Sequence, residues 1–269
     1  MSTGIVCTWT TFKVSTSELL DVSIFDPFLT AKEIEGPISD PRSMGKRFDE
    51  SIFDPLSTGK ATYHSVLYGR IQESPDEYVL VIGWESLQHY QAFAETDEHK
   101  ELMANLKPGA KTHVIDFGQF AFWRHLNCST EILTVYFPSS ILPQDQEAVG
   151  KIYPLIETLQ PIDRASIEAK AYTERPICGW MKDSFQVNGK NTLACVWFNF
   201  WKNRENENRF KRTERRSSYI VNGPFDITPI PGPLALEVFE QDLKGLGAGE
   251  WVGFHVDFKC IQKTRPYLR

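Results

Sequence analysis

The sequence of 269 residues predicts an α+β protein built from two tandem ferredoxin-like halves, each with the element order β-α-β-β-α-β. A strand-like run followed by a polar, helix-like segment occurs twice along the chain. Each run ends on a tryptophan that precedes a phenylalanine by nine residues. Trp84 and Phe93 form the first pair, and Trp201 and Phe210 form the second, 117 positions later. This spacing favours an internal duplication.

The first half, residues 1–126, contains four predicted strands and two predicted helices. Runs rich in β-branched and aromatic residues predict strands at 4–14, 61–72, 78–84 and 112–122. A first helix is expected near 17–20. Apolar residues at helical spacing predict a second helix over 87–106, with Ser86 as its N-cap and a break near Thr96 and Asp97.

The second half, residues 127–269, follows the same plan. Strands are expected at 130–137, 165–175 and 193–201, and helices at 144–159 and directly after Trp201. Pro176, Gly179 and Gly189 predict a connection between the second and third strands. The run at 234–241 is expected to close the half, and the run at 251–260 to be an extra strand at an edge.

Duplication also predicts how the halves are arranged. A four-stranded sheet of this kind covers one face with two helices and leaves the other face bare. Two such sheets within one chain hide both bare faces when they pack together or close into a barrel. We therefore expect a pseudo-dimer within a single chain, which is itself either a monomer or a homodimer.

Composition and charge exclude several classes of function. A net charge of -6 and a pI of about 5.6 disfavour nucleic acid as a partner, because phosphate binding needs a basic surface. The one basic run, from Arg209 to Arg216, is interleaved with Glu207 and Glu214. That pattern favours a solvated helix face, which would include Lys211.

The cysteines and the N-terminus indicate a cytoplasmic protein that does not enter a membrane. The five cysteines are widely spaced, odd in number and free of any CxxC pair, so they predict neither a disulfide framework nor a zinc site. The first residues lack a basic patch followed by an apolar run, and no stretch reaches the length of a membrane span.

Residues 61–122 resemble an antibiotic biosynthesis monooxygenase domain of the dimeric α+β barrel superfamily. The residues that carry the resemblance are VLVIGWES at 79–86, LQHYQAF at 87–93 and the segment 95–108 with its terminal proline. The second half matches by plan and by its Trp-to-Phe spacing. The resemblance implies a small-molecule pocket. Reactions in the superfamily include cofactor-independent monooxygenation, polyketide cyclisation and haem degradation, and some members have no known reaction.

Histidines on predicted strands are the best candidates for acid–base chemistry near neutral pH. His64 is expected to share a strand face with Tyr68, His113 with Phe117, and His255 with a following aspartate. We predict His64, His113 and Tyr68 as catalytic residues. The alternative for each histidine is a structural role. The predicted substrate-binding residues are Trp84, His89, Phe117, Tyr172 and Trp197. No metal and no cofactor are predicted.

The sequence thus predicts an enzyme of specialised metabolism that acts on a hydrophobic polyketide or terpenoid molecule. The expected reaction is a cyclisation, a rearrangement or a cofactor-independent oxygenation in an aromatic-lined pocket. A non-catalytic ligand-binding or stress-response module is the first alternative, and a haem-degrading monooxygenase is the second.

Overall fold

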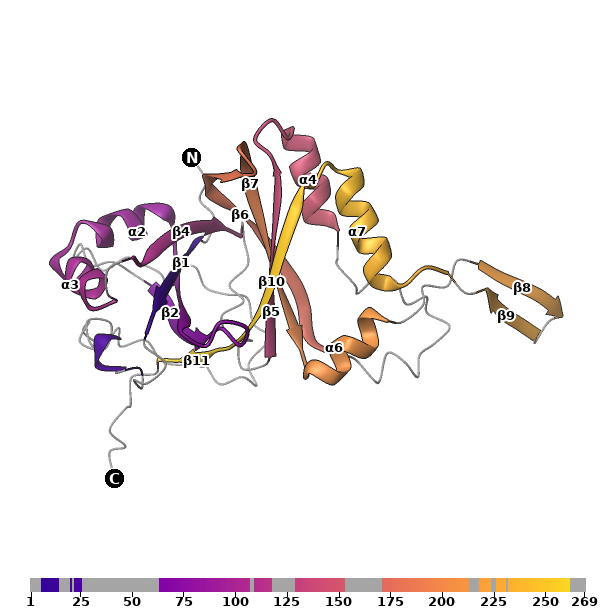
Figure 1. Ribbon diagram of the computed structural model, residues 1–269, viewed down its shortest axis with the longest axis horizontal. Helices are drawn as coiled ribbons and strands as arrows, with labels where there is room; N and C mark the ends of the chain where they lie inside the picture. The colour runs from indigo at the N-terminus through magenta and orange to yellow at the C-terminus, as the bar shows by residue number, and fades with distance from the viewer. Residues whose placement is uncertain are drawn as a thin grey trace, which may run out of the picture.

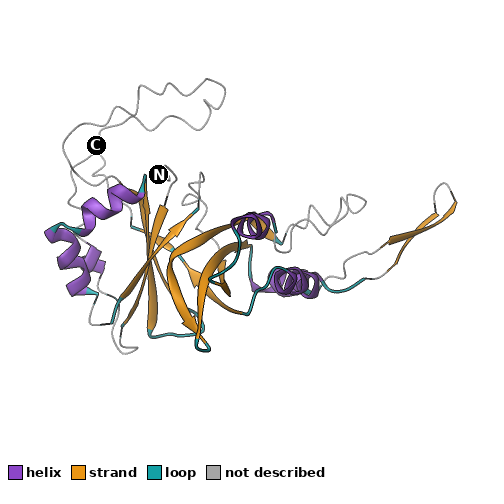
Figure 2. Cartoon of the chain, turned by 90° about the horizontal axis from the view of Figure 1, so that it is seen from above, coloured by secondary structure: helices purple, strands orange, loops and turns teal. Residues whose placement is uncertain are grey.

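The computed structural model describes residues 6–14, 20, 22–25, 63–106, 109–117, 129–152, 171–212, 218–223, 226–230 and 232–261. Nine strands in these ranges form one antiparallel sheet in the order β10-β5-β7-β6-β4-β1-β3-β2-β11. Helices lie on two opposite sides of this sheet (Figure 2). The protein is therefore an α+β protein, as the sequence predicts.

The first part of the chain supplies four neighbouring strands in the order β4-β1-β3-β2. They are β1 (Val6–Lys13), β2 (Tyr63–Arg70), β3 (Glu77–Trp84) and β4 (Lys111–Asp116). A short 3-10 helix, η1, spans Val22–Phe25. Helices α2 (Leu87–Ala94) and α3 (Asp97–Asn105) lie between β3 and β4. The Ser86 and Thr96 side chains cap them, which confirms the predicted N-cap and helix break.

The second part supplies β10-β5-β7-β6, the same order of roles along the chain. Its strands are β5 (Ser129–Pro138), β6 (Tyr172–Val187), β7 (Lys190–Trp201) and β10 (Glu250–Asp257). Helix α4 (Pro143–Lys151) follows β5, α6 (Arg204–Lys211) follows β7, and α7 (Ala235–Gly245) precedes β10. β6 pairs with β4 and so joins the two parts.

The final strands close the sheet into a nearly barrel-shaped structure (Figure 1). β10 lies at one end of the strand order, and β11 (Lys259–Cys260), which follows it along the chain, pairs with β2 at the other end. Ile71 also forms a bridge with Val256, and the Gln72 N–H donates to the His255 carbonyl over 2.9 Å. Closure leaves few strand edges unpaired.

Apolar side chains divide into one inner cluster and two outer clusters. The inner cluster takes residues from both parts of the chain, among them Trp9, Ile115, Phe198 and Val256. Alternating residues of the same strands point outward beneath the helices. Trp84 lies beneath α2 in one outer cluster, and Trp197 lies in the other.

Three predicted features of the second half are wrong. Residues 235–241 belong to helix α7 and Leu234 is its N-cap, because Leu236, Phe239 and Leu243 repeat at helical spacing and pack on the outer cluster. Residues 251–260 are not an extra strand. They contain β10, which is the closing strand that the prediction had assigned to 234–241. β6 continues through Pro176 and Gly179, with register shifts in its pairing with β7. The predicted helix near 17–20 and the second part of the helix 144–159 fall mostly outside the described residues.

Two glycines lie where the halves of the sheet meet. A Cβ on Gly179 of β6 would lie 2.7 Å from the backbone oxygen of Asp116 in β4. A Cβ on Gly69 of β2 would lie 2.9 Å from the backbone oxygen of Asp257. Each contact is with the strand of the other half. Absence of a side chain therefore permits the close approach at both junctions.

Gly179→Ala is expected to lower the free energy of unfolding by about 1–3 kcal/mol, because the new methyl group meets backbone atoms that cannot rotate away. Denaturant unfolding measures the change. Gly150→Ala is the matched control: its Cβ would have no atom within 4 Å, and helix α4 should not lose stability. Equal stability of wild type and Gly179→Ala would contradict close packing at this junction.

Strands β8 (Ser218–Gly223) and β9 (Asp226–Ile230) form a separate hairpin. It projects away from the sheet beyond α6 and α7 in both views (Figures 1 and 2). Among the helices in the described ranges, none combines the length and apolarity needed to cross a membrane.

Candidate functional site

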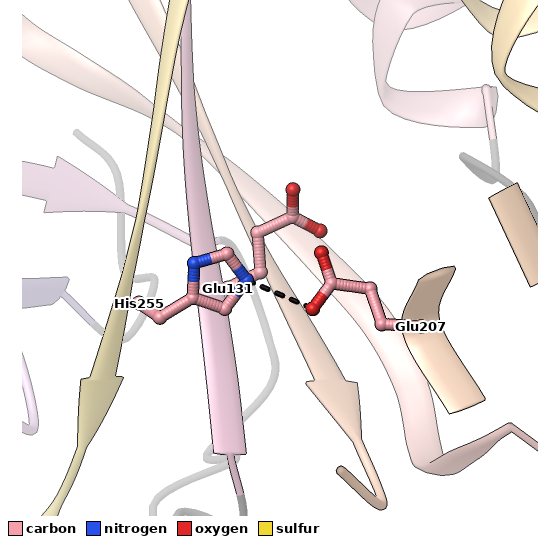
Figure 3. A group of neighbouring side chains, drawn as sticks. All are labelled: Glu131, Glu207 and His255. Atoms are coloured by element: carbon pink, nitrogen blue, oxygen red, sulfur yellow. Dashed lines mark hydrogen bonds and ion pairs between the residues drawn. The ribbon is translucent and has the colours of Figure 1, made fainter. Parts of the chain in front are cut away.

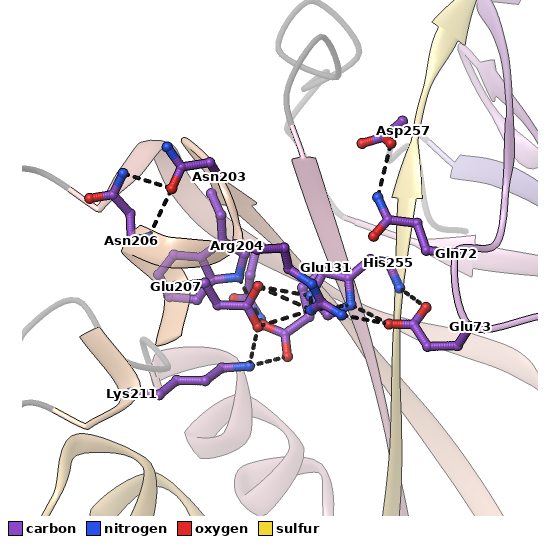
Figure 4. Close-up of polar contacts among 12 residues, drawn as sticks. Gln72, Glu73, Glu131, Asn203, Arg204, Asn206, Glu207, Lys211, His255 and Asp257 are labelled. Atoms are coloured by element: carbon purple, nitrogen blue, oxygen red, sulfur yellow. Dashed lines mark hydrogen bonds and ion pairs between the residues drawn. The ribbon is translucent and has the colours of Figure 1, made fainter. Parts of the chain in front are cut away.

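A cluster of charged side chains lies between the sheet and helix α6 (Figure 4). We call it the charged cluster and define it by its three carboxylates and three basic side chains. β5 supplies Glu131, α6 supplies Arg204, Glu207 and Lys211, β10 supplies His255, and the turn between β2 and β3 supplies Glu73. The cluster therefore assembles four segments that are distant in the sequence.

Glu131 is held on the floor of the cluster by its strand neighbours. Its side chain is 8% exposed. The Trp201 indole N–H donates to Glu131 Oε2 over 2.9 Å, and the Asn199 amide donates to the same oxygen over 3.2 Å. Glu131 pairs with Asn199 in the β5–β7 register, so these contacts follow from the sheet itself. Both donors are neutral, so the negative charge needs a cation elsewhere.

Lys211 supplies that cation for two carboxylates at once. Its Nζ donates to Glu131 Oε1 and to Glu207 Oε1, each over 2.6 Å. Burial alone would raise the pKa of Glu207, but hydrogen bonds from His255 and Lys211 outweigh it and lower the pKa to about 2. Burial would likewise lower the pKa of Lys211, and the two carboxylates raise it above its ordinary value.

The His255 ring lies between the carboxylates of Glu207 and Glu73, and Figure 3 shows its contact with Glu207. Its Nε2 is 2.9 Å from Glu207 Oε2, and its Nδ1 is 2.7 Å from Glu73 Oε1. The ring side chain is 6% exposed, whereas the Glu73 side chain is 39% exposed. A chain of contacts therefore runs from solvent through Glu73 and His255 to the buried carboxylate of Glu207.

Arg204 gives the His255 ring a second set of partners. Its Nη1 lies 2.6 Å from Nδ1 and also contacts Nε2, and its Nη2 donates to Glu73 over 2.9 Å. A protonated ring can donate one hydrogen bond to each of the two carboxylates.

Three residues of the cluster also carry donor atoms suited to a metal ion. The nearest side-chain oxygens and nitrogen of Glu131, Glu207 and His255 all lie within 4.8 Å of one another (Figure 3). The two carboxylates of this group are already bridged, because the Lys211 ammonium lies between them. Its positive charge serves as the counter-ion there.

Among the described residues, the matching positions in the first part of the chain carry no charged cluster. Trp84 pairs with Val6 of β1, and Trp201 pairs with Ser129 of β5. Two residues further along these strands lie Thr8 and Glu131, which therefore occupy equivalent positions. The first-half indole accordingly donates to Thr8 Oγ1 over 3.0 Å, as the second-half indole donates to Glu131. Helices α2 and α6 correspond over their whole length of eight residues.

Five positions of the cluster, and that of the neighbouring Asn199, can be compared in this way. In the first half the equivalent residues are uncharged and mostly apolar: Thr8, Ile82, Leu87, Tyr90, Ala94 and Val114. In the second half they are Glu131, Asn199, Arg204, Glu207, Lys211 and His255. The space between the sheet and the helix after the third strand can therefore be filled by mostly apolar side chains in this architecture. Buried ion pairs seldom improve on such a filling in stability, so the cluster requires another explanation.

The predicted solvated helix face is wrong for two residues. Glu207 is 2% exposed and the Lys211 side chain is 19% exposed, since both point from α6 toward β5. The remaining α6 residue of the basic run, Arg209, donates to Asn206 in an exposed pair. Alternating charge on a helix predicts exposure only when no buried counter-charge faces it.

The predicted catalytic residues lie on the first half of the sheet. His64 is the extra residue at a register shift in β2, so simple alternation no longer relates it to Tyr68; its side chain lies outside the described part. Tyr68 packs beneath the helices, with its ring 5.0 Å from that of Phe25. The His113 Nδ1 lies 2.9 Å from Asp183 Oδ2, and its ring is 5.1 Å from Phe185. The structure does not bring His113 and Tyr68 together, because they lie in different layers.

Four of the five predicted substrate-binding residues are divided among the three apolar clusters. Trp84 is fully buried against Phe93, while His89 is half-buried beside Ser86 on the first turn of α2. The others are Phe117 in the inner cluster, and Tyr172 and Trp197 in the second outer cluster. Of these, the Trp197 indole N–H is buried without a hydrogen-bond partner among the described residues. These five residues do not form one site.

Sequence reasoning missed five members of the charged cluster. It identified His255 as a strand histidine but paired it with Asp257, which instead accepts a hydrogen bond from Gln72. Comparing the halves position by position was the available signal. Charged residues then appear at Arg204, Lys211 and His255, where the first part of the chain has Leu87, Ala94 and Val114.

The sequence matches no protein-family model, and no curated protein matches it. Solved structures give a likeness in fold. A candidate monooxygenase from Lactobacillus acidophilus has 9% identity and a TM-score of 0.48, with 97% of each chain covered. An anthrone oxidase-like protein has 10% identity and a TM-score of 0.47, covering 98% of this chain and 97% of its own. A candidate monooxygenase from Fusobacterium nucleatum has 9% identity and a TM-score of 0.47, covering 97% of this chain and 95% of its own. These names describe those proteins and assign no activity to this chain.

Proposed function

We propose that the chain is a small-molecule enzyme that uses acid–base chemistry without a bound organic cofactor. The observation that carries the proposal is the buried His255 ring, whose two nitrogens lie within hydrogen-bond distance of the Glu73 and Glu207 carboxylates. Glu73 links the ring to solvent, and Glu207 holds a negative charge on its inner side. A substrate proton taken by this group can therefore pass to water.

The substrate class we propose is a hydrophobic aromatic, polyketide or terpenoid molecule with an activated C–H or O–H bond. Loss of its proton leaves a carbanion or enolate that can cyclise, rearrange or react with molecular oxygen directly. Lys211 and Arg204 supply fixed positive charge near the developing anion. Such chemistry belongs to specialised metabolism in the cytoplasm.

We also propose that residues 1–126 and 127–269 are two ferredoxin-like halves of a pseudo-dimer. The strand orders β4-β1-β3-β2 and β10-β5-β7-β6 support this proposal, as does the correspondence of Trp84 with Trp201. In this arrangement the first half keeps an apolar filling beneath its second helix, and only the second half carries acid–base groups.

Oxidation of an anthrone by oxygen is a suitable test reaction. Its central methylene is acidic, and removal of a proton allows O2 to convert it to the quinone with release of water. We expect wild type to accelerate oxygen uptake, and His255→Gln to lower kcat/KM at least about a hundredfold. Tyr90→Phe, at the first-half position equivalent to Glu207, should retain the wild-type rate.

Thermal unfolding of each variant separates loss of catalysis from loss of folding. A folded His255→Gln variant with the wild-type rate would overturn the assignment of His255. If His113→Ala or His64→Ala instead abolished turnover, the acid–base site would belong to the first half. Oxygen uptake no faster than in buffer, across a panel of acidic anthrones and quinols, would overturn the proposed oxygenation.

A non-catalytic ligand-binding module is the second candidate. The observation in favour of this second candidate is that the six charged groups of the cluster are already paired with one another. In that case the charged cluster would stabilise only the junction between Glu73 and the second half. Binding of an anthrone without turnover, unchanged in His255→Gln, is the result that this candidate predicts.

A further inference from the structure

Two free cysteines lie side by side on the outward face of the second half. Cys178 of β6 pairs with Trp197 of β7, and Cys195 of β7 pairs with Trp180 of β6. The thiols are therefore diagonal neighbours on adjacent antiparallel strands. Both belong to the outer apolar cluster beneath α4, so their side chains point in the same direction. Diagonal neighbours on one face are about 7–8 Å apart, with their Cβ atoms somewhat closer.

The two thiols lie close enough to shift each other's pKa. The Cys178 sulfur lies 4.0 Å from the backbone oxygen of Gly150 in α4. Cys195 is fully buried, whereas Cys178 is partly exposed. Cys7 is buried in the inner cluster and lies away from this pair. An oxidant from solvent can therefore reach Cys178 before Cys195.

The environment also divides the chemical roles. The neighbouring Cys195 thiol lowers the pKa of Cys178, which favours the nucleophilic thiolate there. Burial raises the pKa of Cys195 well above its ordinary value, so that residue remains a thiol. The order of attack follows from this difference.

We infer that Cys178 and Cys195 form a reversible disulfide on exposure to hydrogen peroxide. The Cys178 thiolate attacks the peroxide and breaks its O–O bond, which gives a sulfenic acid at Cys178 and, after protonation, water. The Cys195 thiol then attacks the Cys178 sulfur, and a second water leaves with the thiol proton. Two thiols are oxidised to one disulfide, and one hydrogen peroxide is reduced to two waters.

This disulfide is expected to be easy to reduce. Diagonal neighbours are normally somewhat farther apart than relaxed disulfide geometry allows, so the strands must shift to form the bond. The register shift in β6 just after Trp180 provides a place where β6 can adjust. Strained disulfides are the ones that thiols reduce readily.

Mass spectrometry of the full chain after hydrogen peroxide treatment tests the inference. Free thiols are alkylated under denaturing conditions, and the protein is then digested with trypsin. Lys182 and Lys190 lie between the two cysteines, so the disulfide joins two separate peptides. We expect wild type to lose the mass of two hydrogens in this linked pair, and dithiothreitol to restore it.

Single variants supply the controls. Cys195→Ala should lack the linked peptides and retain a sulfenic acid at Cys178 that dimedone traps. Cys178→Ala should show neither the link nor trapping at Cys195. Full alkylation of both cysteines in peroxide-treated wild type would overturn the inference, as would a disulfide that joins either one to a different cysteine. Near-UV circular dichroism before treatment verifies that each variant is folded.

Discussion

Lys211→Met is expected to lower the free energy of unfolding by about 3–5 kcal/mol, because it leaves two buried carboxylates without their shared cation. Lys211 Nζ lies 2.6 Å from an oxygen of Glu131 and of Glu207. Methionine fills a similar volume, so packing changes little while the charge is lost. Urea denaturation monitored by tryptophan fluorescence measures the difference, with m-values compared to confirm the same transition.

Lys100→Met is the matched control for this experiment. Lys100 also forms a 2.7 Å ion pair on a helix, with Asp97, but its side chain is 68% exposed. Exposed pairs of this kind contribute at most about 1 kcal/mol. Adding Glu131→Gln to Lys211→Met should recover part of the lost stability, because one unpaired charge is removed. Similar effects for the Lys100 and Lys211 variants would contradict a buried cluster.

Acidification is expected to remove about 3 kcal/mol of stability through Glu207 alone. The pKa of this carboxyl is about 2 in the folded protein and ordinarily 4.5. A depressed pKa means that the unfolded chain binds the proton first. The stabilisation is therefore complete above about pH 5 and is lost as the pH falls toward 2. Unfolding free energies measured in steps from pH 6 to pH 2.5 give the slope.

The comparison with two variants isolates this carboxyl from the others. Glu207→Gln should flatten the pH dependence, and it should start from a lower stability at pH 6. Glu147→Gln should leave the pH dependence nearly unchanged, since Glu147 and its partner Lys151 are 70% and 72% exposed. A Glu207→Gln curve that runs parallel to wild type would show that other groups cause the acid sensitivity.

Much of the strand and helix pattern could be predicted because local periodicity carried it. β3, β7 and the helices after them combine β-branched runs with helical spacing, and each Trp-to-Phe pair places its rings in contact. Residues 234–241 show why other elements failed. Leu234, Leu236 and Val238 alternate as in a strand, and only the wider window to Leu243 reveals the helical repeat.

The charged cluster could not be predicted in the same way, because its residues meet only after the sheet has formed. Glu131 and His255 are direct partners across β5 and β10, a register that no local pattern specifies. Glu207 and Lys211 read as an exposed helix face until α6 is placed over that pair. Glu73 reaches the ring from a turn of the other half.

The placement of residues 250–260 has a consequence for synthesis. β10 pairs with β5, and β11 then pairs with β2, so the end of the described chain fills an edge that formed far earlier. On the ribosome, the edge of β2 that faces away from β3 must wait for that segment with its backbone groups unpaired. Such a nascent chain exposes a template for other strands. We expect nascent forms shortened before residue 250 to require chaperone protection that the released protein does not need.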